Sequence, residues 1–143
     1  MQSNFSKTRL YNLLKQRRKH FVFIPTIIYW IILFVLTSIP SNALPSPFGI
    51  SDKVEHFIAY LILSIFIAMS LHFQKAYTFL SRHFFLTSIV ITTFYGIFDE
   101  FHQYYIPGRY CELWDIAANI CGVLSGTLIG LYFINTQVQN KLD

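Results

Sequence analysis

The chain has 143 residues, enough for one domain, of which 54% are hydrophobic, 18% aromatic and only 13% charged. This composition excludes a disordered chain and a nucleic-acid-binding protein, and with a mean hydropathy of +0.46 it indicates a membrane protein with several spans. A soluble helical bundle would carry a polar stripe on every helix, whereas residues 27–35 have none.

Stretches without charged residues locate the spans in chain order. Because a helix needs about 20 mainly apolar residues to cross the hydrocarbon core, we expect transmembrane helices at about 21–39, 55–73, 84–104 and 114–134. The third span is unusual, since its charge-free part ends at Phe98 and its length requires Asp99 and Glu100 to enter the membrane. The sequence therefore predicts an all-α membrane protein with a four-helix bundle over residues 21–134.

Basic residues predict the orientation of this bundle, because Lys and Arg are retained on the cytoplasmic side. Nine of the eleven lie before the first span, between the second and third, or after the fourth: Lys7, Arg9, Lys15, Arg17, Arg18, Lys19, Lys75, Arg82 and Lys141. Both termini are then cytoplasmic, with a basic juxtamembrane segment at 1–20 and a tail at 135–143. We expect Lys7–His20 to form a short interfacial helix that contacts anionic lipid.

The acidic residues have the opposite distribution. Six of the seven fall at the predicted outer ends of the last three spans: Asp52, Glu55, Asp99, Glu100, Glu112 and Asp115. Lys53, Arg109 and His102 lie at the same level. Because ionisable groups in a span are costly, they should face the bundle interior or a watery cavity.

Helical spacing predicts that polar faces from three spans meet at this level, since residues four apart share a face. The faces are Asp52, His56 and Tyr60 on the second span, Gly96, Asp99 and Gln103 on the third, and Asp115 and Asn119 on the fourth. Below the last face, small residues recur every fourth position at Ala118, Gly122, Gly126 and Gly130. That stripe predicts close packing against another helix.

Structural roles compete with functional ones for several of these residues. Glu55 and Glu112 sit where helices begin, and acids there cap exposed N–H groups. Lys53 and Arg109 are candidate ion-pair partners for the acids, and His56 could simply hydrogen-bond to Asp52 or a backbone carbonyl. The Asp99–Glu100 pair is harder to assign to structure, because adjacent buried carboxylates need a cation, a shared proton or a ligand.

Four motifs in series resemble the VanZ-like family of bacterial membrane proteins between about Ser38 and Gly130. They read Asp52-Lys53-x-x-His56-x-x-x-Tyr60, Tyr95-Gly96-x-x-Asp99-Glu100-x-x-Gln103, Pro107-Gly108-Arg109 and Asp115-x-x-Ala118-Asn119-x-x-Gly122. The resemblance implies a multi-pass protein of the bacterial cytoplasmic (inner) membrane, in a family named after a member linked to low-level teicoplanin resistance. It implies no particular reaction.

The leading hypothesis is a polar site, open to the outer leaflet, that binds an envelope component or an amphiphile such as a lipoglycopeptide. The resemblance and the helical faces give the same candidate ligand-binding residues: Asp52, Lys53, His56, Tyr60, Asp99, Glu100, Gln103, Arg109, Asp115 and Asn119. One alternative is an enzyme acting on a lipid-linked phosphate or glycan, with His56, Asp99 or Glu100 as the catalytic base.

A further alternative is a structural or proton-carrying bundle. We expect no cofactor and no metal, because no spaced His/Cys motif is present, although the residue types leave metal ligation by Asp, His and Glu open. The sequence specifies neither the ligand nor the oligomeric state.

Overall fold

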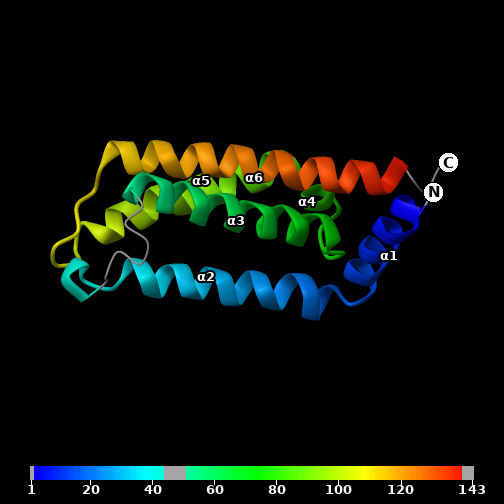
Figure 1. Cartoon of the computed structure of the whole chain (residues 1–143), viewed down its shortest axis with the longest axis horizontal. Coiled ribbons are helices and arrows are strands. Elements are labelled where there is room, and N and C mark those ends of the chain that lie inside the picture. Colours follow the sequence, from blue (N-terminus) through cyan, green and yellow to red (C-terminus); the bar gives the residue numbers. More distant parts are fainter. Residues whose placement is uncertain (1, 44–50, 140–143) are drawn as a thin grey trace.

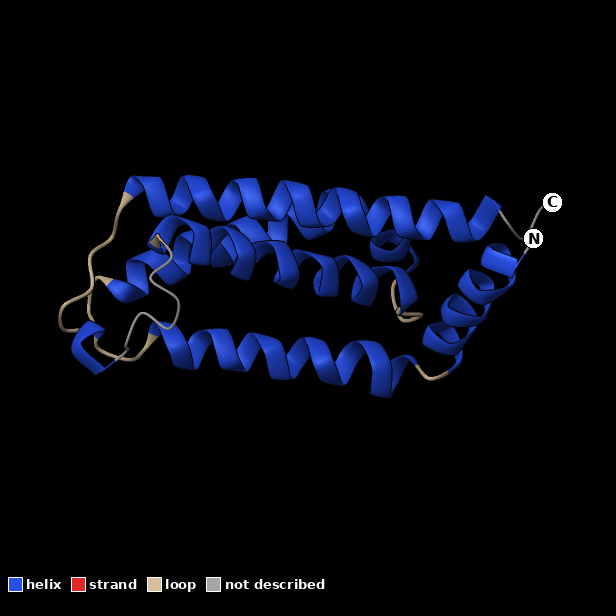
Figure 2. Ribbon diagram, in the orientation of Figure 1, coloured by secondary structure: helices blue, strands red, loops and turns tan. Residues whose placement is uncertain are grey.

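The computed structural model describes residues 2–43 and 51–139, with side chains from residue 9 onward, and helices are the only regular elements in these ranges (Figures 1 and 2). In chain order the elements are α1 (Gln2–Gln16), a π-helical turn η1 (Lys19–Phe23), α2 (Ile24–Thr37), a 3-10 turn η2 (Ser41–Ala43), α3 (Asp52–Phe73), α4 (Thr78–Arg82), α5 (Phe84–Gln103) and α6 (Leu113–Gln139).

Four helical segments are long and apolar enough to cross a membrane: Lys19–Thr37, Asp52–Phe73, Phe84–Gln103 and Leu113–Gln139. The predicted all-α fold with four spans is therefore confirmed. Large apolar side chains such as Ile27, Phe94 and Leu128 are exposed on these helices, as expected of surfaces that face lipid.

Several helix boundaries differ by a few residues from the predicted spans, most at the two ends of the chain. α6 continues to Gln139 instead of ending near 134, because Ile134 and Gln137 remain buried against the bundle and extend its contact face. The N-terminal helix spans Gln2–Gln16 instead of 7–20. The end of the predicted tail, residues 140–143, lies outside the described residues.

α1 lies at an angle to the four long helices, beside the C-terminal end of α6 (Figure 1). It contacts the bundle through Tyr11, which is buried and packs against Phe73 with ring centroids 5.2 Å apart and ring planes tilted by 54°. The Tyr11 hydroxyl also lies 3.1 Å from His72 Nε2. The N-terminal helix is thus anchored to the end of α3.

α3 and α6 form the most extensive helix pair of the bundle. Their backbones come close because Gly122 and Gly126 face α3: an added Cβ would meet the carbonyl oxygens of Phe57 and Leu61 respectively. Deeper in, a Cβ on Gly130 would lie 3.3 Å from Ala68 Cβ. This approach fixes the first turn of α6 against the first turns of α3.

α2 makes lighter contacts with the remaining helices. The Thr26 hydroxyl lies 2.8 Å from Ser70 Oγ on α3. Trp30 packs edge-on against Tyr95 on α5, with centroids 5.0 Å apart. These contacts hold the middle of α2 and leave its last turns to line a cavity.

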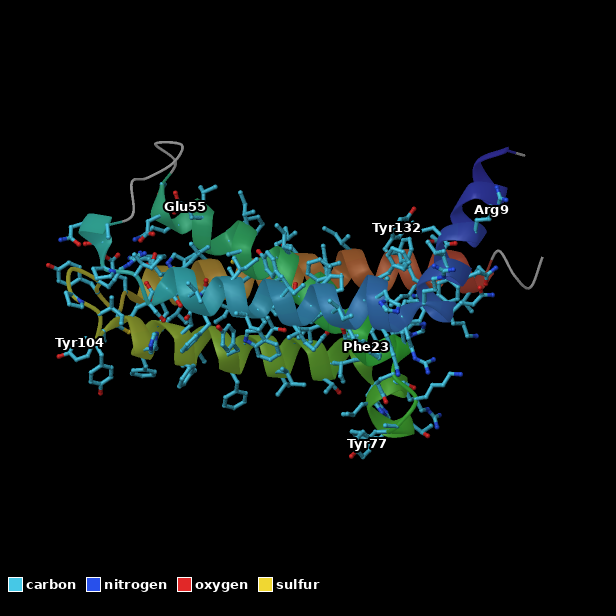
Figure 3. All side chains as sticks on the ribbon, turned by 90° about the horizontal axis from the view of Figure 1, so that it is seen from below. Arg9, Phe23, Glu55, Tyr77, Tyr104 and Tyr132 are labelled. Carbon is cyan, nitrogen blue, oxygen red and sulfur yellow. The ribbon has the colours of Figure 1, made fainter. Side chains whose placement is uncertain are left out.

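The described chain has two distinct ends (Figure 1). At one end lie α1 and the end of α6, and at the other lie the start of α3, the end of α5 and the α5–α6 loop. Figure 3 shows Arg9 and Tyr77 towards the first end and Glu55 and Tyr104 towards the second. Which end faces the cytoplasm stays a prediction from the charge distribution.

Candidate functional site

A cavity of about 530 Å³ lies at the end of the bundle where α3 and α6 begin and α5 ends. Seven of the ten predicted ligand-binding residues line it: Asp52, His56, Tyr60, Asp99, Gln103, Arg109 and Asp115. The other three do not line the cavity but contact residues that do: Lys53 contacts Asp115, and Glu100 and Asn119 contact His56. Glu55 and Glu112, for which the sequence favoured capping, also line the cavity.

The cavity has an apolar wall that the sequence did not predict. Leu33 and Leu36 from the last turns of α2 line it, together with Ala59 from α3. Nothing distinguishes the two leucines from the lipid-facing residues around them in a uniformly apolar span. Their role follows only from the position of α2 beside the other helices.

The α5–α6 loop closes the cavity near the end of α2. Gly108 has a positive φ of 75°, and an added Cβ there would collide with the Ser41 side chain. The Ser41 amide donates to Pro107 O at 3.4 Å. Pro107-Gly108-Arg109 is one of the four motifs found in the sequence, whereas the contact of Gly108 with Ser41 depends on tertiary packing.

His56 is held by a defined set of hydrogen-bond acceptors. Its Nδ1 lies 3.0 Å from Asn119 Oδ1 and 3.2 Å from Glu100 Oε1. Because both are acceptors, Nδ1 carries a proton. Nε2 points the other way, 3.7 Å from Asp52 Oδ1. The bonds to Asn119 and Glu100 tie α3 to α6 and α5, and they leave Nε2 facing the cavity residues.

The adjacent carboxylates Asp99 and Glu100 are buried and point to different partners. Asp99 Oδ2 accepts a hydrogen bond of 2.9 Å from the Tyr60 hydroxyl on α3. Glu100 Oε1 accepts from Asn119 Nδ2 at 3.4 Å on α6. Within the described part of the chain, Asp99 Oδ1 and Glu100 Oε2 have no hydrogen-bond partner. A buried carboxylate oxygen left in this state is costly unless a proton, cation or ligand donor meets it.

The two cations of the site have different surroundings. Lys53 Nζ bonds to Glu112 Oε2 at 2.7 Å and Asp115 Oδ1 at 2.9 Å, which links α3 to the start of α6. Arg109 has no carboxylate within 4.0 Å among residues 9–43 and 51–139, and its Nε donates to Ile39 O at 3.4 Å. Lys53 is therefore an ion-pair partner, as one reading of the sequence expected, while the Arg109 guanidinium is available.

The lining is strongly acidic. It contains five carboxylates and one Arg, namely Asp52, Glu55, Asp99, Glu112, Asp115 and Arg109. Even with Lys53 beside them, the acids outnumber the permanent cations. Such a site favours ligands that bring hydrogen-bond donors or positive charge.

A protein-family model matches almost the whole chain. The VanZ/LLP1 model matches residues 2–134, which include all four spans up to Ile134 and every residue of the cavity. This chain belongs to the VanZ/LLP1 family. The match also takes in the N-terminal helix α1, which the motif resemblance between Ser38 and Gly130 did not cover.

Among curated proteins, an uncharacterized protein of the fission yeast Schizosaccharomyces pombe is 26% identical over 110 residues. The match covers 77% of this chain and 65% of that protein, so this VanZ/LLP1 chain spans less than two thirds of its relative's length. No solved structure matches the chain. Because a fungal protein matches, family membership does not by itself specify a bacterial membrane or an effect on antibiotics.

Proposed function

We propose that this VanZ/LLP1 protein binds the polar headgroup of an envelope amphiphile in the cavity, at the outer face of the bacterial cytoplasmic membrane. The proposal rests on Arg109, which is half-buried, has no carboxylate partner in the described chain and lines the same cavity as the apolar side chains of Leu33 and Leu36. The wall formed by Leu33, Leu36 and Ala59 suits an acyl or prenyl chain, and the wall that carries Arg109 and the carboxylates suits a charged headgroup.

Arg109 is the group we assign to an anionic part of the ligand. A guanidinium presents a planar fork that matches the oxygens of a phosphate or carboxylate in a bidentate way. Among the described residues, its side chain donates one hydrogen bond, from Nε to the Ile39 carbonyl, which leaves the remaining N–H donors of the fork for the ligand.

The carboxylates select the rest of the headgroup. Asp52, Asp99 and Asp115 present oxygens that accept hydrogen bonds from hydroxyl, amide or ammonium groups. A headgroup that joins one anionic group to several such donors therefore fits better than a simple phosphate. Lipid-linked glycans and lipoglycopeptides such as teicoplanin belong to this chemical class.

The test uses a matched pair of probes, a polyprenyl phosphate bearing one sugar and the same lipid with a neutral linkage. Binding to the full chain in detergent micelles is measured by native mass spectrometry. Wild-type protein should bind the phosphate-bearing lipid more tightly, and Arg109→Gln should lose this preference. The control is Arg82→Gln, at the end of α4 and far from the cavity lining.

Equal preference in wild type and Arg109→Gln would contradict the proposal. In cells, expression of the wild-type chain should lower teicoplanin susceptibility if this member shares the effect for which the family is named, and Arg109→Gln should not. A glycopeptide without the acyl chain controls for general changes in the envelope.

A further inference from the structure

The acidic cavity has more negative charge than its own cations neutralise. Lys53 bonds to Glu112 and Asp115, and Arg109 has no carboxylate partner within the described residues. The Asp99 side chain is 1% exposed, lines the cavity and leaves Oδ1 without a hydrogen-bond partner in the described chain. A bound cation would compensate part of this negative charge.

Three side chains in this lining have the composition and spacing of metal ligands. Asp52, His56 and Asp115 each offer one ligand atom, and these atoms all lie within 4.8 Å of one another. His56 Nε2 and Asp52 Oδ1 are 3.7 Å apart. Two ligands of a tetrahedral ion with bonds of about 2.1 Å are separated by about 3.4 Å, so small side-chain movements suffice.

His56 is already oriented as a metal ligand. Metal-bound imidazoles usually donate their other N–H to a carboxylate or carbonyl, which fixes the tautomer and the ring position. In this chain Nδ1 faces Glu100 Oε1 at 3.2 Å and Asn119 Oδ1 at 3.0 Å. The lone pair of neutral His56 is therefore on Nε2, on the side of Asp52.

We propose that Asp52, His56 and Asp115 bind a divalent transition-metal ion such as Zn²⁺ or Mn²⁺ in this cavity. An imidazole with two carboxylates favours these ions over Mg²⁺ and Ca²⁺, which prefer oxygen ligands alone. Three protein ligands leave a coordination position open to the cavity, where a ligand oxygen can bind. This site does not depend on the proposed headgroup, because the ion binds without any lipid.

Lys53 competes with the metal ion for the same carboxylates. Its Nζ lies 2.9 Å from Asp115 Oδ1 and 3.9 Å from Asp52 Oδ2. Metal binding therefore requires Lys53 to withdraw towards Glu112, its partner at 2.7 Å. Replacing Lys53 by an uncharged residue should strengthen metal binding, the opposite of what loss of a ligand does.

The experiment titrates Mn²⁺ into EDTA-treated full-length protein in detergent, with free Mn²⁺ followed by electron paramagnetic resonance. Wild-type protein should take up one equivalent, displaced by Zn²⁺ and not by equal Mg²⁺. His56→Gln and Asp52→Asn should weaken binding at least about tenfold, and Lys53→Met should strengthen it. Glu55→Gln, an acid of the same cavity outside the triad, should bind as wild type does.

A spectroscopic signature separates ligation from nonspecific attraction by acids. Bound Mn²⁺ should show the nuclear modulation of an imidazole nitrogen in wild type, and Asp115→Asn should weaken binding while folding is checked by size-exclusion chromatography. Asp52, whose side chain is 51% exposed, gives a variant that preserves folding if the buried positions do not. No uptake by wild type, no nitrogen signal, or an equal loss in Glu55→Gln would overturn the metal site, while the Arg109 test would stand unchanged.

Discussion

The two ends of the bundle are both rich in charge but use it differently. At the end that carries α1, a hollow of about 740 Å³ is lined by Lys15, Arg17, Arg18, Lys19 and Lys75. Most of these side chains are exposed, so water and lipid headgroups can solvate them. At the other end, Asp99, Glu100 and Asp115 are buried.

This difference distinguishes the candidate functional site from the basic end. Solvated basic groups need no particular partner and suffice to set orientation and attract anionic lipid. Buried acids persist only where hydrogen bonds, cations or ligands compensate them. The acidic cavity is therefore the end where changes to single residues should matter most, and the following predictions test that contrast.

The largest expected effect concerns which end is outside. A membrane-impermeant maleimide applied to intact cells should label Cys111 in the α5–α6 loop, and Cys111→Ser should abolish labelling. The remaining Cys121 lies within the α6 span, where the reagent does not reach. Labelling that requires opened cells would reverse the predicted orientation.

The same reaction should depend steeply on pH. Burial, and then the charges of Glu100 and Asp115, raise the pKa of the Cys111 thiol. Only the thiolate reacts, so labelling should be slow at neutral pH and rise about tenfold per pH unit below the pKa.

The next largest effect is expected from a change in the contact between α3 and α6, the two helices that begin at the acidic cavity. Gly126→Val should destabilise the protein by about 3 kcal/mol or more, because its side chain would overlap the Leu61 carbonyl of α3. The comparison variant is Gly130→Val, since a Cβ there would lie 3.3 Å from Ala68 Cβ instead of overlapping a backbone carbonyl. Thermal unfolding in detergent measures both, and equal melting temperatures would show that α3 and α6 do not pack this closely.

A smaller loss is expected from Tyr60→Phe. This change removes the hydrogen bond to Asp99 Oδ2. Asp99 is only 1% exposed, so water cannot replace the lost donor. The expected cost is about 1–3 kcal/mol. Tyr29→Phe, which loses a bond to the neutral Ala59 carbonyl, should cost about 1 kcal/mol. A larger loss of stability in Tyr29→Phe than in Tyr60→Phe would show that the buried Asp99 carboxylate does not depend on the Tyr60 hydrogen bond.

The smallest effect should come from the exposed ion pair at the mouth of the cavity. Glu112→Gln removes a partner of Lys53, but the two side chains are 47% and 39% exposed. The free energy of unfolding should change by less than about 1 kcal/mol, and less still in high salt. A large loss of stability would show that the Lys53–Glu112 ion pair helps to hold the bundle together.

Sequence reasoning succeeded where the information was local. Charge-free stretches located the four spans, and the four-residue spacing of Asp52, His56 and Tyr60 placed them on one helix face that the cavity shares. Such patterns depend only on helix geometry and on the cost of charges in lipid. The close approach of α3 and α6 also had a local signal in the glycines of α6.

Contacts between helices could not be predicted in the same way. No sequence pattern separates Lys53, which bonds to Glu112 and Asp115, from Arg109, which meets no carboxylate in the described chain. It also missed Leu33, because an apolar residue that faces a cavity looks like one that faces lipid. These distinctions arise from distances between elements remote in the chain.

One cavity between α2 and the other helices should receive the amphiphile. The most direct measurement is photo-crosslinking with a polyprenyl phosphate probe that carries a diazirine on the part of its prenyl chain next to the headgroup, followed by mass spectrometric mapping. Labels should concentrate on Leu36, Ala59 and Tyr110, which line the cavity. Labels confined to lipid-facing positions such as Ile31 and Phe94, or to the basic hollow around Lys15, would contradict this account.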